Sequence, residues 1–153
     1  MWVPPEDHDP VILHAPTRKS IAVFGAVCAE NGKLVTHHSK IFAADTFLEF
    51  LQRVVRHKKR DQKMVLVLDN ARYHHAKAIQ PWLKEHRKIL ALDFLPPYSP
   101  ELNPIERVWK MIRRLRIHNR YFAELNELMQ TVSEQFAFWR KPNETLRRLC
   151  AII

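Results

Sequence analysis

Apolar positions along the first third of the chain alternate with turn signals in an order that predicts a hairpin followed by a helix. Residues 19–28 and 34–42 are rich in β-branched and aromatic side chains, a composition typical of strands. The Asn-Gly dipeptide at 31–32 favours a tight turn between them, so an antiparallel hairpin is expected. Apolar residues then recur at helical spacing over 45–55, which predicts an amphipathic helix.

The middle of the chain predicts a strand–helix–strand unit. Five consecutive apolar residues at 64–68 indicate a strand buried on both faces, as in a parallel sheet covered by helices. Residues 75–87 predict a helix, and 89–95 predict a second strand. This order favours a parallel pair of strands joined by a crossover. The expected fold class is therefore α/β, with at least four strands in one layer.

A proline-rich segment separates the last predicted strand from the next helix. Prolines at 96, 97, 100 and 104 fix φ and disfavour helix at the residues before them. Asn103 can cap a helix, Pro104 fits its first position, and Glu106 then falls on the first turn. A carboxylate is thus expected at a rigid strand-to-helix junction.

The two ends of the chain differ in character. Residues 1–18 contain four prolines and no periodicity, and are expected to form an entry loop. The helix from Pro104 carries an apolar stripe, and further helices are predicted over 122–139 and after Pro142. We expect a single domain over 1–153, in which residues 121–153 form a helical carboxyl-terminal extension.

Composition narrows the class of protein. The chain has 153 residues, 46% of them hydrophobic, which suits one domain with a real core. It has no apolar run of membrane-span length, and residues 1–10, without a basic or an apolar region, are not expected to form a secretory signal. Cys28 and Cys150 are too few and too far apart for a disulfide framework or a zinc knuckle. A reducing, cytoplasmic compartment without membrane partners is the expectation.

The positive charge lies mainly beyond residue 52. The formal net charge is +9; residues 1–52 carry four Lys and Arg against six Asp and Glu, whereas residues 53–153 carry 21 against 10. Such a basic portion suits a polyanion, most simply nucleic acid, although a merely soluble basic protein is the alternative.

Two carboxylates stand where sheet-edge chemistry is expected. Asp69 directly follows the predicted strand at 64–68, and carboxyl ends of strands are where α/β sheets place ligand sites. Glu106 follows the next strand. Each has a structural alternative, since Asp69 can cap a turn and Asn103 with Glu106 resembles a capping box. Together on one edge, they predict a pair of Mg²⁺ or Mn²⁺ ions for phosphodiester transfer on DNA.

Residues 68–75 and 95–110 resemble the second and third acid motifs of the DDE transposases. The match is with the mariner-related bacterial insertion-sequence group, the "six-thirty" group, which Pro16-Thr-Arg-Lys-Ser and His118-Asn-Arg-Tyr-Phe also resemble. The resemblance implies a ribonuclease H-like fold, a mixed sheet flanked by helices, and metal-dependent cleavage and transfer of transposon-end DNA. The 36 residues between Asp69 and Glu106 fit the spacing of that group.

The resemblance also assigns roles to individual residues. Asp69 and Glu106 are the expected catalytic metal ligands, with Mg²⁺ or Mn²⁺ in a two-metal site. Asn70 and Asn103 are expected to orient the acids, and His74 to lie beside them. The basic face of the helix after Pro104 is expected to contact DNA phosphates: Arg107, Lys110, Arg113, Arg114 and Arg116.

The first acid of the family has no counterpart in this sequence. Trp2-Val-Pro4 resembles a segment that follows that acid, so the first Asp and its central strand are expected upstream of Met1. Glu6, Asp7 and Asp9 lie in the proline-rich loop and are not assigned its role. The chain is thus interpreted as the carboxyl part of a transposase catalytic domain. The alternative is a non-catalytic remnant that binds DNA, or that dimerises with itself or with full-length transposase.

Overall fold

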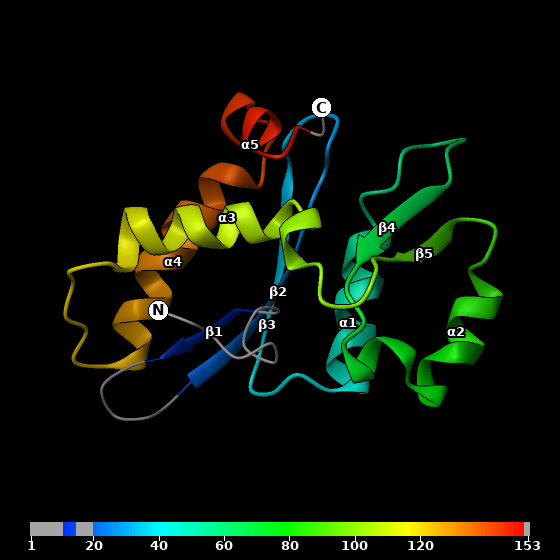
Figure 1. The fold of residues 1–153 in the computed structure, drawn as a ribbon, viewed down its shortest axis with the longest axis horizontal. Coiled ribbons are helices and arrows are strands. Elements are labelled where there is room, and N and C mark those ends of the chain that lie inside the picture. Colours follow the sequence, from blue (N-terminus) through cyan, green and yellow to red (C-terminus); the bar gives the residue numbers. More distant parts are fainter. Residues whose placement is uncertain (1–10, 15–19, 152–153) are drawn as a thin grey trace.

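The structure is a computed structural model that describes residues 11–14 and 20–151. It contains a three-stranded antiparallel sheet, a two-stranded parallel sheet and five α-helices within those ranges. Figure 1 shows β2 and β3 of the antiparallel sheet near the middle of the molecule, with the parallel pair β4 and β5 to the right of it. The strands and α-helices are β1 (Val11–His14), β2 (Ser20–Val27), β3 (Leu34–Ser39), α1 (Ala44–Val55), β4 (Met64–Leu68), α2 (Gln80–Glu85), β5 (Leu90–Phe94), α3 (Ile105–Ile112), α4 (Leu125–Trp139) and α5 (Glu144–Leu149).

The antiparallel sheet has the order β1-β2-β3. The predicted hairpin is confirmed as β2 and β3, joined through Gly32, whose φ of +76° is the left-handed conformation that glycine adopts without strain. β1 is an addition, because residues 11–14 were expected to lie in a loop. It pairs with the first half of β2, with Val11 opposite Val23 and His14 opposite Ser20. The rest of that expected loop, 1–10 and 15–18, lies outside the described residues.

The parallel sheet confirms the strand–crossover–strand unit, with β4 and β5 in parallel register. The helix predicted over 75–87 is wrong in extent. Two short 3₁₀ turns, at Arg72–His75 and Lys77–Ile79, precede α2, which spans only Gln80–Glu85. Pro81 explains the late start, because proline lacks an N–H and is compatible only with the first turn of a helix.

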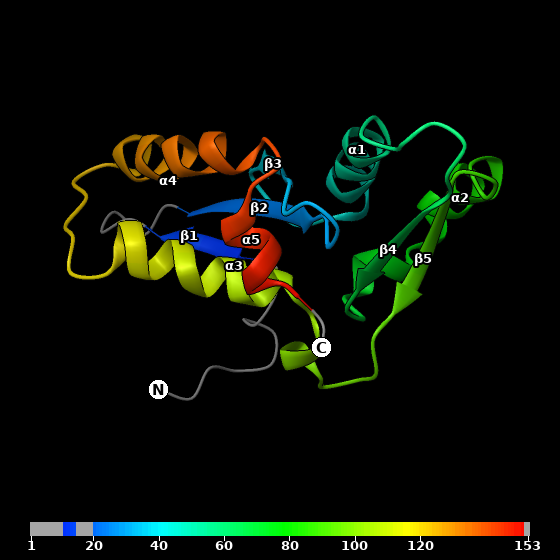
Figure 2. The ribbon, with the colours of Figure 1, turned by 90° about the horizontal axis from the view of Figure 1, so that it is seen from above.

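The prediction that β4 is buried on both faces is also wrong. Leu66 and Leu68 pack against the cluster around α1, whereas Val65 and Val67 on the opposite face are 58% and 43% exposed. The physical reason is that β2 and β4 are not paired, so the helices that cover one face of the antiparallel sheet do not extend over β4. Figure 2 shows α3, α4 and α5 gathered around β1 and β2, away from β4 and β5.

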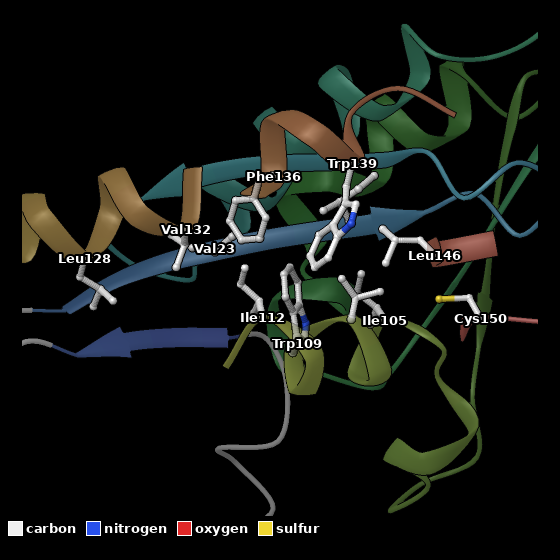
Figure 3. Packing of buried hydrophobic residues seen from close by; sticks show 12 residues of the cluster. Val23, Ile105, Trp109, Ile112, Leu128, Val132, Phe136, Trp139, Leu146 and Cys150 are labelled. Carbon is white, nitrogen blue, oxygen red and sulfur yellow. The ribbon is translucent and has the colours of Figure 1, made fainter. Parts of the chain in front are cut away.

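The faces of β2 contribute to two separate clusters. Phe24 packs with α1, β4 and β5. Val23, on the other face, packs with α3, α4 and α5 around Trp109, which is 1% exposed, as its place on the apolar stripe predicted. Figure 3 shows Trp109 within this cluster. A Cβ at Gly25 would clash with the indole ring, so a glycine is what allows α3 to lie so close to β2.

Three helices form the carboxyl-terminal part of the chain. α3 begins one residue later than expected, at Ile105, and continues as a π-helical turn over Arg113–Ile117. α4 begins at Leu125 rather than 122, and the predicted last helix is α5. Both cysteines are free, and burial raises the pKa of the Cys150 thiol to about 11. Within the described ranges, none of the helices is long and apolar enough to cross a membrane.

Asn143 joins α5 to the β2–β3 hairpin, and its removal is expected to destabilise both. Its side-chain oxygen accepts the amide of Leu146 at 2.8 Å, and its Nδ2 donates to the carbonyl of Gly32 at 3.0 Å. Asn143→Ala should lower the free energy of unfolding by about 2 kcal/mol, measured by urea denaturation. Asn143→Asp is the matched control, because it keeps the cap acceptor and loses only the donor. Equal stability of the alanine variant and the wild type would contradict this role.

Candidate functional site

The candidate site is built where β4 ends and α3 begins. The amide of Leu95 donates to the carbonyl of Leu68 at 2.8 Å, so the pairing of the two parallel strands continues to their carboxyl ends. The Nδ2 of Asn70 donates to the carbonyl of Leu95 at 2.6 Å, and its Oδ1 lies 3.2 Å from Nε2 of His75. Asn70 therefore ties the segment after β4 to the segment after β5.

Asp69 is held in one orientation by its own turn. Its Oδ1 accepts the amide of Ala71 at 3.0 Å and lies 3.1 Å from Nδ1 of His74. The same Nδ1 lies 2.9 Å from the backbone oxygen of Asp69. Because a carbonyl oxygen only accepts, Nδ1 must carry the proton. The carboxylate remains 28% exposed, so it can still reach a ligand.

His74 is fixed by aromatic packing. It is buried, with its ring centroid 4.5 Å from that of Phe47 on α1 and 4.6 Å from that of Tyr73. Both contacts come from side chains that pack within the α1 cluster. The core thus positions the imidazole, which in turn positions the carboxylate of Asp69.

Glu106 lies on the first turn of α3, half-buried, with its Oε1 inaccessible to solvent. Its amide donates to the carbonyl of Asn103 at 3.1 Å. Asn103 is buried, and its Oδ1 accepts the amide of Ile105 at 3.4 Å. The N-cap of α3 is Pro104, one residue after the predicted Asn103, and it has no side-chain cap hydrogen bond. The short 3₁₀ turn Pro100–Leu102 precedes Asn103, so the proline-rich segment and the Asn103 side chain together set the position of Glu106.

A single cavity of about 690 Å³ connects these elements. Leu68 and His74 from the Asp69 turn line it, together with Leu95, Asn103 and Ile105 from the segment that leads to Glu106. Asp69 and Glu106 are not among the residues that line the cavity, but each adjoins one that is, Leu68 and Ile105. Carboxylates are oxygen donors that suit Mg²⁺ or Mn²⁺. Within residues 11–14 and 20–151, however, no group of three or more His, Cys, Asp or Glu side chains could enclose a metal ion. The chemistry of these carboxylate donors fits a hard divalent cation.

The family model for the DDE superfamily endonucleases matches residues 1–129. The chain belongs to this family. A protein from an insertion element of Shigella sonnei, the IS630 39 kDa protein, is 27% identical over 108 residues, which are 71% of this chain and 31% of that protein. The uncharacterized protein y4pE/y4sA of Sinorhizobium fredii is 35% identical over 119 residues, 78% of this chain and 82% of the relative. The resemblance to the mariner-related insertion-sequence transposases is thereby confirmed.

Solved structures place the DDE endonuclease chain in the expected fold. The catalytic domain of the Mos1 mariner transposase superposes with a TM-score of 0.71 at 18% identity, over 93% of this chain and 72% of that one. The Mos1 strand transfer complex gives 0.66 at 19% identity, over 98% and 44%. The ribonuclease H-like, mixed α/β fold is confirmed. The chain spans about a third of the Shigella relative and under half of the Mos1 chain in that complex.

The five cations predicted to contact DNA are not equivalent in the structure. Arg107 donates from Nη1 to the carbonyls of Leu149 and Ala151, at 3.1 and 3.3 Å, and so ties α3 to the end of α5. The Nε of Arg116 donates to the side-chain oxygen of Gln135 on α4 at 3.1 Å. These two side chains have structural roles that sequence reasoning missed.

The other three cations of this family member differ in exposure. Lys110 and Arg114 are exposed, and Arg113 is half-buried. The amphipathic pattern of α3 predicted an exposed cationic face, but not which cations hold other helices. Sequence reasoning also missed that the aromatic side chains of Phe47 and Tyr73 fix His74, because those contacts depend on how α1 packs.

Proposed function

We propose that this chain is part of a transposase catalytic domain in which Asp69 and Glu106 hold divalent metal ions for cleavage and joining of DNA strands at transposon ends. The observation that carries the proposal is that the turn of Asp69 and the segment leading to Glu106 border one cavity in a DDE endonuclease fold. The Mos1 mariner paired end complex, a structure described as containing Mn, is similar in fold. The match covers 98% of this chain and 46% of that one.

The residues of the site have separable tasks in this proposal. Mg²⁺ or Mn²⁺, when bound, supplies activation of a water or 3′-hydroxyl and stabilises the leaving oxygen. Asp69 and Glu106 provide oxygen ligands. His74 and the amide of Ala71 hold the Asp69 carboxylate in place, and Asn103 fixes the first turn of α3. Such support matters because metal ligands need accurate positions.

DNA is the proposed partner, contacted through its phosphates by the exposed cations Lys110 and Arg114, with Arg113 beside them. We also propose that the protein pairs with a second copy of itself or with full-length transposase, as a dimer at transposon ends. Two complexes of Mos1, the strand transfer complex and the paired end complex, support the proposal of a DNA partner.

Strand cleavage tests this function. The chain is expressed together with the coding sequence that precedes Met1, and incubated with plasmid carrying the ends of its insertion element. Nicks at the element ends are expected with Mg²⁺ or Mn²⁺, and none with EDTA. Cleavage that is unchanged by EDTA, or absent with every divalent ion, would contradict the proposal.

A second function, DNA binding without catalysis, is favoured by the lack of a three-donor cluster among the described residues. It predicts that the logarithm of the DNA-binding constant falls linearly with the logarithm of the salt concentration. Replacing both Lys110 and Arg114 with alanine should reduce that slope by about 2, measured by fluorescence anisotropy across a salt series. Arg107→Ala is the matched control, because Arg107 already donates to two carbonyls. An unchanged slope in the double variant would remove α3 and the π-helical turn that follows it from the DNA-binding surface.

A further inference from the structure

A second pocket, of about 240 Å³, lies at the free edge of β3 and is called the edge pocket. β3 pairs with β2 on one side, and no other strand among the described residues pairs with it. The strand contacts both α1 and α4. Figure 2 shows α1 and the carboxyl-terminal end of α4 above β2 in that view, and α3 below it. Only Val35 and His57 also line the larger cavity, so the edge pocket is built mainly from residues outside the candidate functional site.

Cations dominate the lining of the edge pocket. Three arginines and one histidine surround three residues of β3, and no Asp or Glu is among the lining residues, which are Leu34, Val35, Thr36, Arg53, Arg56, His57 and Arg140. Within the described part of the chain, none of the three arginines has an ion pair. Guanidinium groups that lack a carboxylate partner are the groups with which proteins most often bind planar or multivalent anions.

All three arginines lie at helix ends. Arg53 is in the last turn of α1, Arg56 is the C-cap of α1, and Arg140 is the C-cap of α4. The carboxyl end of a helix carries about half a negative charge, so stabilisation of the helices is the structural alternative for these side chains. Two helix ends supply only about one negative charge against three positive charges. The edge pocket therefore keeps a net charge of about +2.

The pKa values of two nearby histidines report the same positive field. Burial first, and then the charges of His37, Arg53 and Arg140, lower the pKa of His38. Burial first, and then nearby cations, lower the pKa of His57. No acid is among these causes. The cations around the edge pocket are thus not neutralised by a carboxylate.

The backbone of β3 adds a hydrogen-bond donor to the pocket wall. The amide of Cys28 donates to the carbonyl of Lys33 at 2.9 Å, so odd-numbered residues of this strand bond toward β2. Thr36 therefore directs its N–H and C=O to the free edge. Its carbonyl accepts a hydrogen bond from Nη1 of Arg53 at 3.1 Å, which agrees with this direction. The N–H of Thr36 remains as a donor beside the arginines.

A phosphate group fits this set of donors. Arg53 uses one N–H for the carbonyl of Thr36, and a guanidinium group has five, so four remain. Arginines bind phosphate oxygens through pairs of parallel hydrogen bonds. A water in the liquid occupies about 30 Å³, so the pocket holds roughly eight groups of that size, enough for the four oxygens of a phosphate. A carboxylate, with two oxygens, would leave most of these donors unused.

We propose that the edge pocket binds a phosphate group between its three arginine side chains, with the N–H of Thr36 as a further donor. Arg56 and Arg140 have no side-chain hydrogen bond to give up within the described residues, and Arg53 keeps its bond to β3. The phosphate is a phosphodiester of a DNA strand or a free phosphate ion, since both present the same charged oxygens. The proposal rests on the geometry of the edge pocket and not on the proposed function.

An NMR titration of the ¹⁵N-labelled chain with sodium phosphate tests the site. The side-chain Nε–H signals of Arg56 and Arg140 and the amide signal of Thr36 should shift along one saturation curve. Sodium chloride of the same ionic strength should not shift them, and the signals of Arg60, which is exposed and outside the pocket, should stay in place in both salts. Shifts that do not saturate, or that are the same in chloride, would overturn the proposal.

Substitution of the arginines locates the bound phosphate. Arg56→Gln and Arg140→Gln should each weaken phosphate binding about 10-fold, because each removes charge-assisted hydrogen bonds. Lysine at either position keeps the charge but not the paired donors, and should bind phosphate with intermediate affinity. Arg60→Gln is the matched control: it removes one charge from the same segment and should leave the affinity within about twofold. A circular dichroism melt checks that each variant folds. Equal weakening by Arg60→Gln would show a general charge effect and overturn the site.

A short DNA duplex distinguishes the two sources of phosphate. If the pocket holds a DNA phosphate, the double variant Arg56→Gln, Arg140→Gln should reduce the salt slope of duplex binding by about 1, as expected for one phosphate contact. If the slope is unchanged while binding of inorganic phosphate is lost, the ligand is the free ion. Retention of both the slope and phosphate binding in this variant would overturn the proposal. These measurements involve no strand cleavage, so they are independent of whether the proposed function fails.

Discussion

Asp69→Asn and Glu106→Gln are each expected to reduce metal-dependent strand cleavage by about 1,000-fold or more. Loss of a charged ligand removes several kcal/mol of charge stabilisation, and each 1.36 kcal/mol is tenfold in rate. Both substitutions keep the shape of the side chain. An asparagine at 69 still offers an oxygen to the amide of Ala71, so the turn after β4 should survive. The measurement is the initial rate of nicking in Mg²⁺, with a thermal melt of each variant as the check on folding.

Exposed carboxylates close to the same segments provide the matched controls. Asp93 on β5 and Glu101 in the proline-rich segment are both exposed. Asp93→Asn and Glu101→Gln remove one negative charge each and should leave cleavage within about twofold of the wild type, since surface substitutions usually have small effects. Comparable losses in the controls, or cleavage above a tenth of the wild-type rate in Asp69→Asn, would contradict the assignment of the metal ligands.

Gly25→Ala is expected to lower the free energy of unfolding by about 3 kcal/mol. The added Cβ would meet the ring of Trp109, which is almost fully buried and surrounded by α4 and α5. Overpacking of a well-packed core typically costs 1–3 kcal/mol, and an indole ring held on both sides has little room to move. Urea denaturation of the purified variant, with the slope compared with that of the wild type, measures the effect.

A double-mutant cycle separates this clash from a general weakness at Gly25. Trp109→Leu alone should be destabilising by about 3 kcal/mol because it leaves a cavity. Combined with Gly25→Ala, it should cost at least 1 kcal/mol less than the sum of the single changes, since the smaller side chain makes room for the methyl group. Phe47→Leu lies in the cluster on the opposite face of β2 and should be additive with Gly25→Ala. Additivity in both pairs would show that Trp109 is not the obstacle.

Local sequence signals predicted the elements whose partners are close in the chain. The Asn-Gly turn placed the β2–β3 hairpin, and the apolar runs placed β4 and β5 in a parallel pair. β1 was missed because four residues among prolines gain their strand character only by pairing with β2. The exposure of Val65 and Val67 was missed for a related reason: an apolar run shows that a strand prefers burial, and only the tertiary arrangement shows which face is covered.

For the candidate site, too, the sequence predicted the residues that stand in local motifs and not the contacts that depend on distant segments. Asp69 and Glu106 stand in motifs that can be recognised along the chain, and the structure brings the segments carrying them to one cavity. The role of Arg107 was not predictable, because its acceptors are carbonyls at the end of α5, more than 40 residues later. An amphipathic pattern gives the face on which a cation lies. It does not give the distant backbone group to which that cation donates a hydrogen bond.

Paramagnetic broadening by Mn²⁺ tests the central claim most directly, that Asp69 and Glu106 share one divalent metal site in this chain. In ¹⁵N-labelled protein, a low concentration of Mn²⁺ should broaden the amide signals around residues 69–71 and 103–107 together, and Mg²⁺ in excess should restore them. Asp69→Asn should remove the broadening in both segments at once, while Glu101→Gln should leave it intact. Broadening centred elsewhere, or confined to one of the two segments, would contradict a shared site.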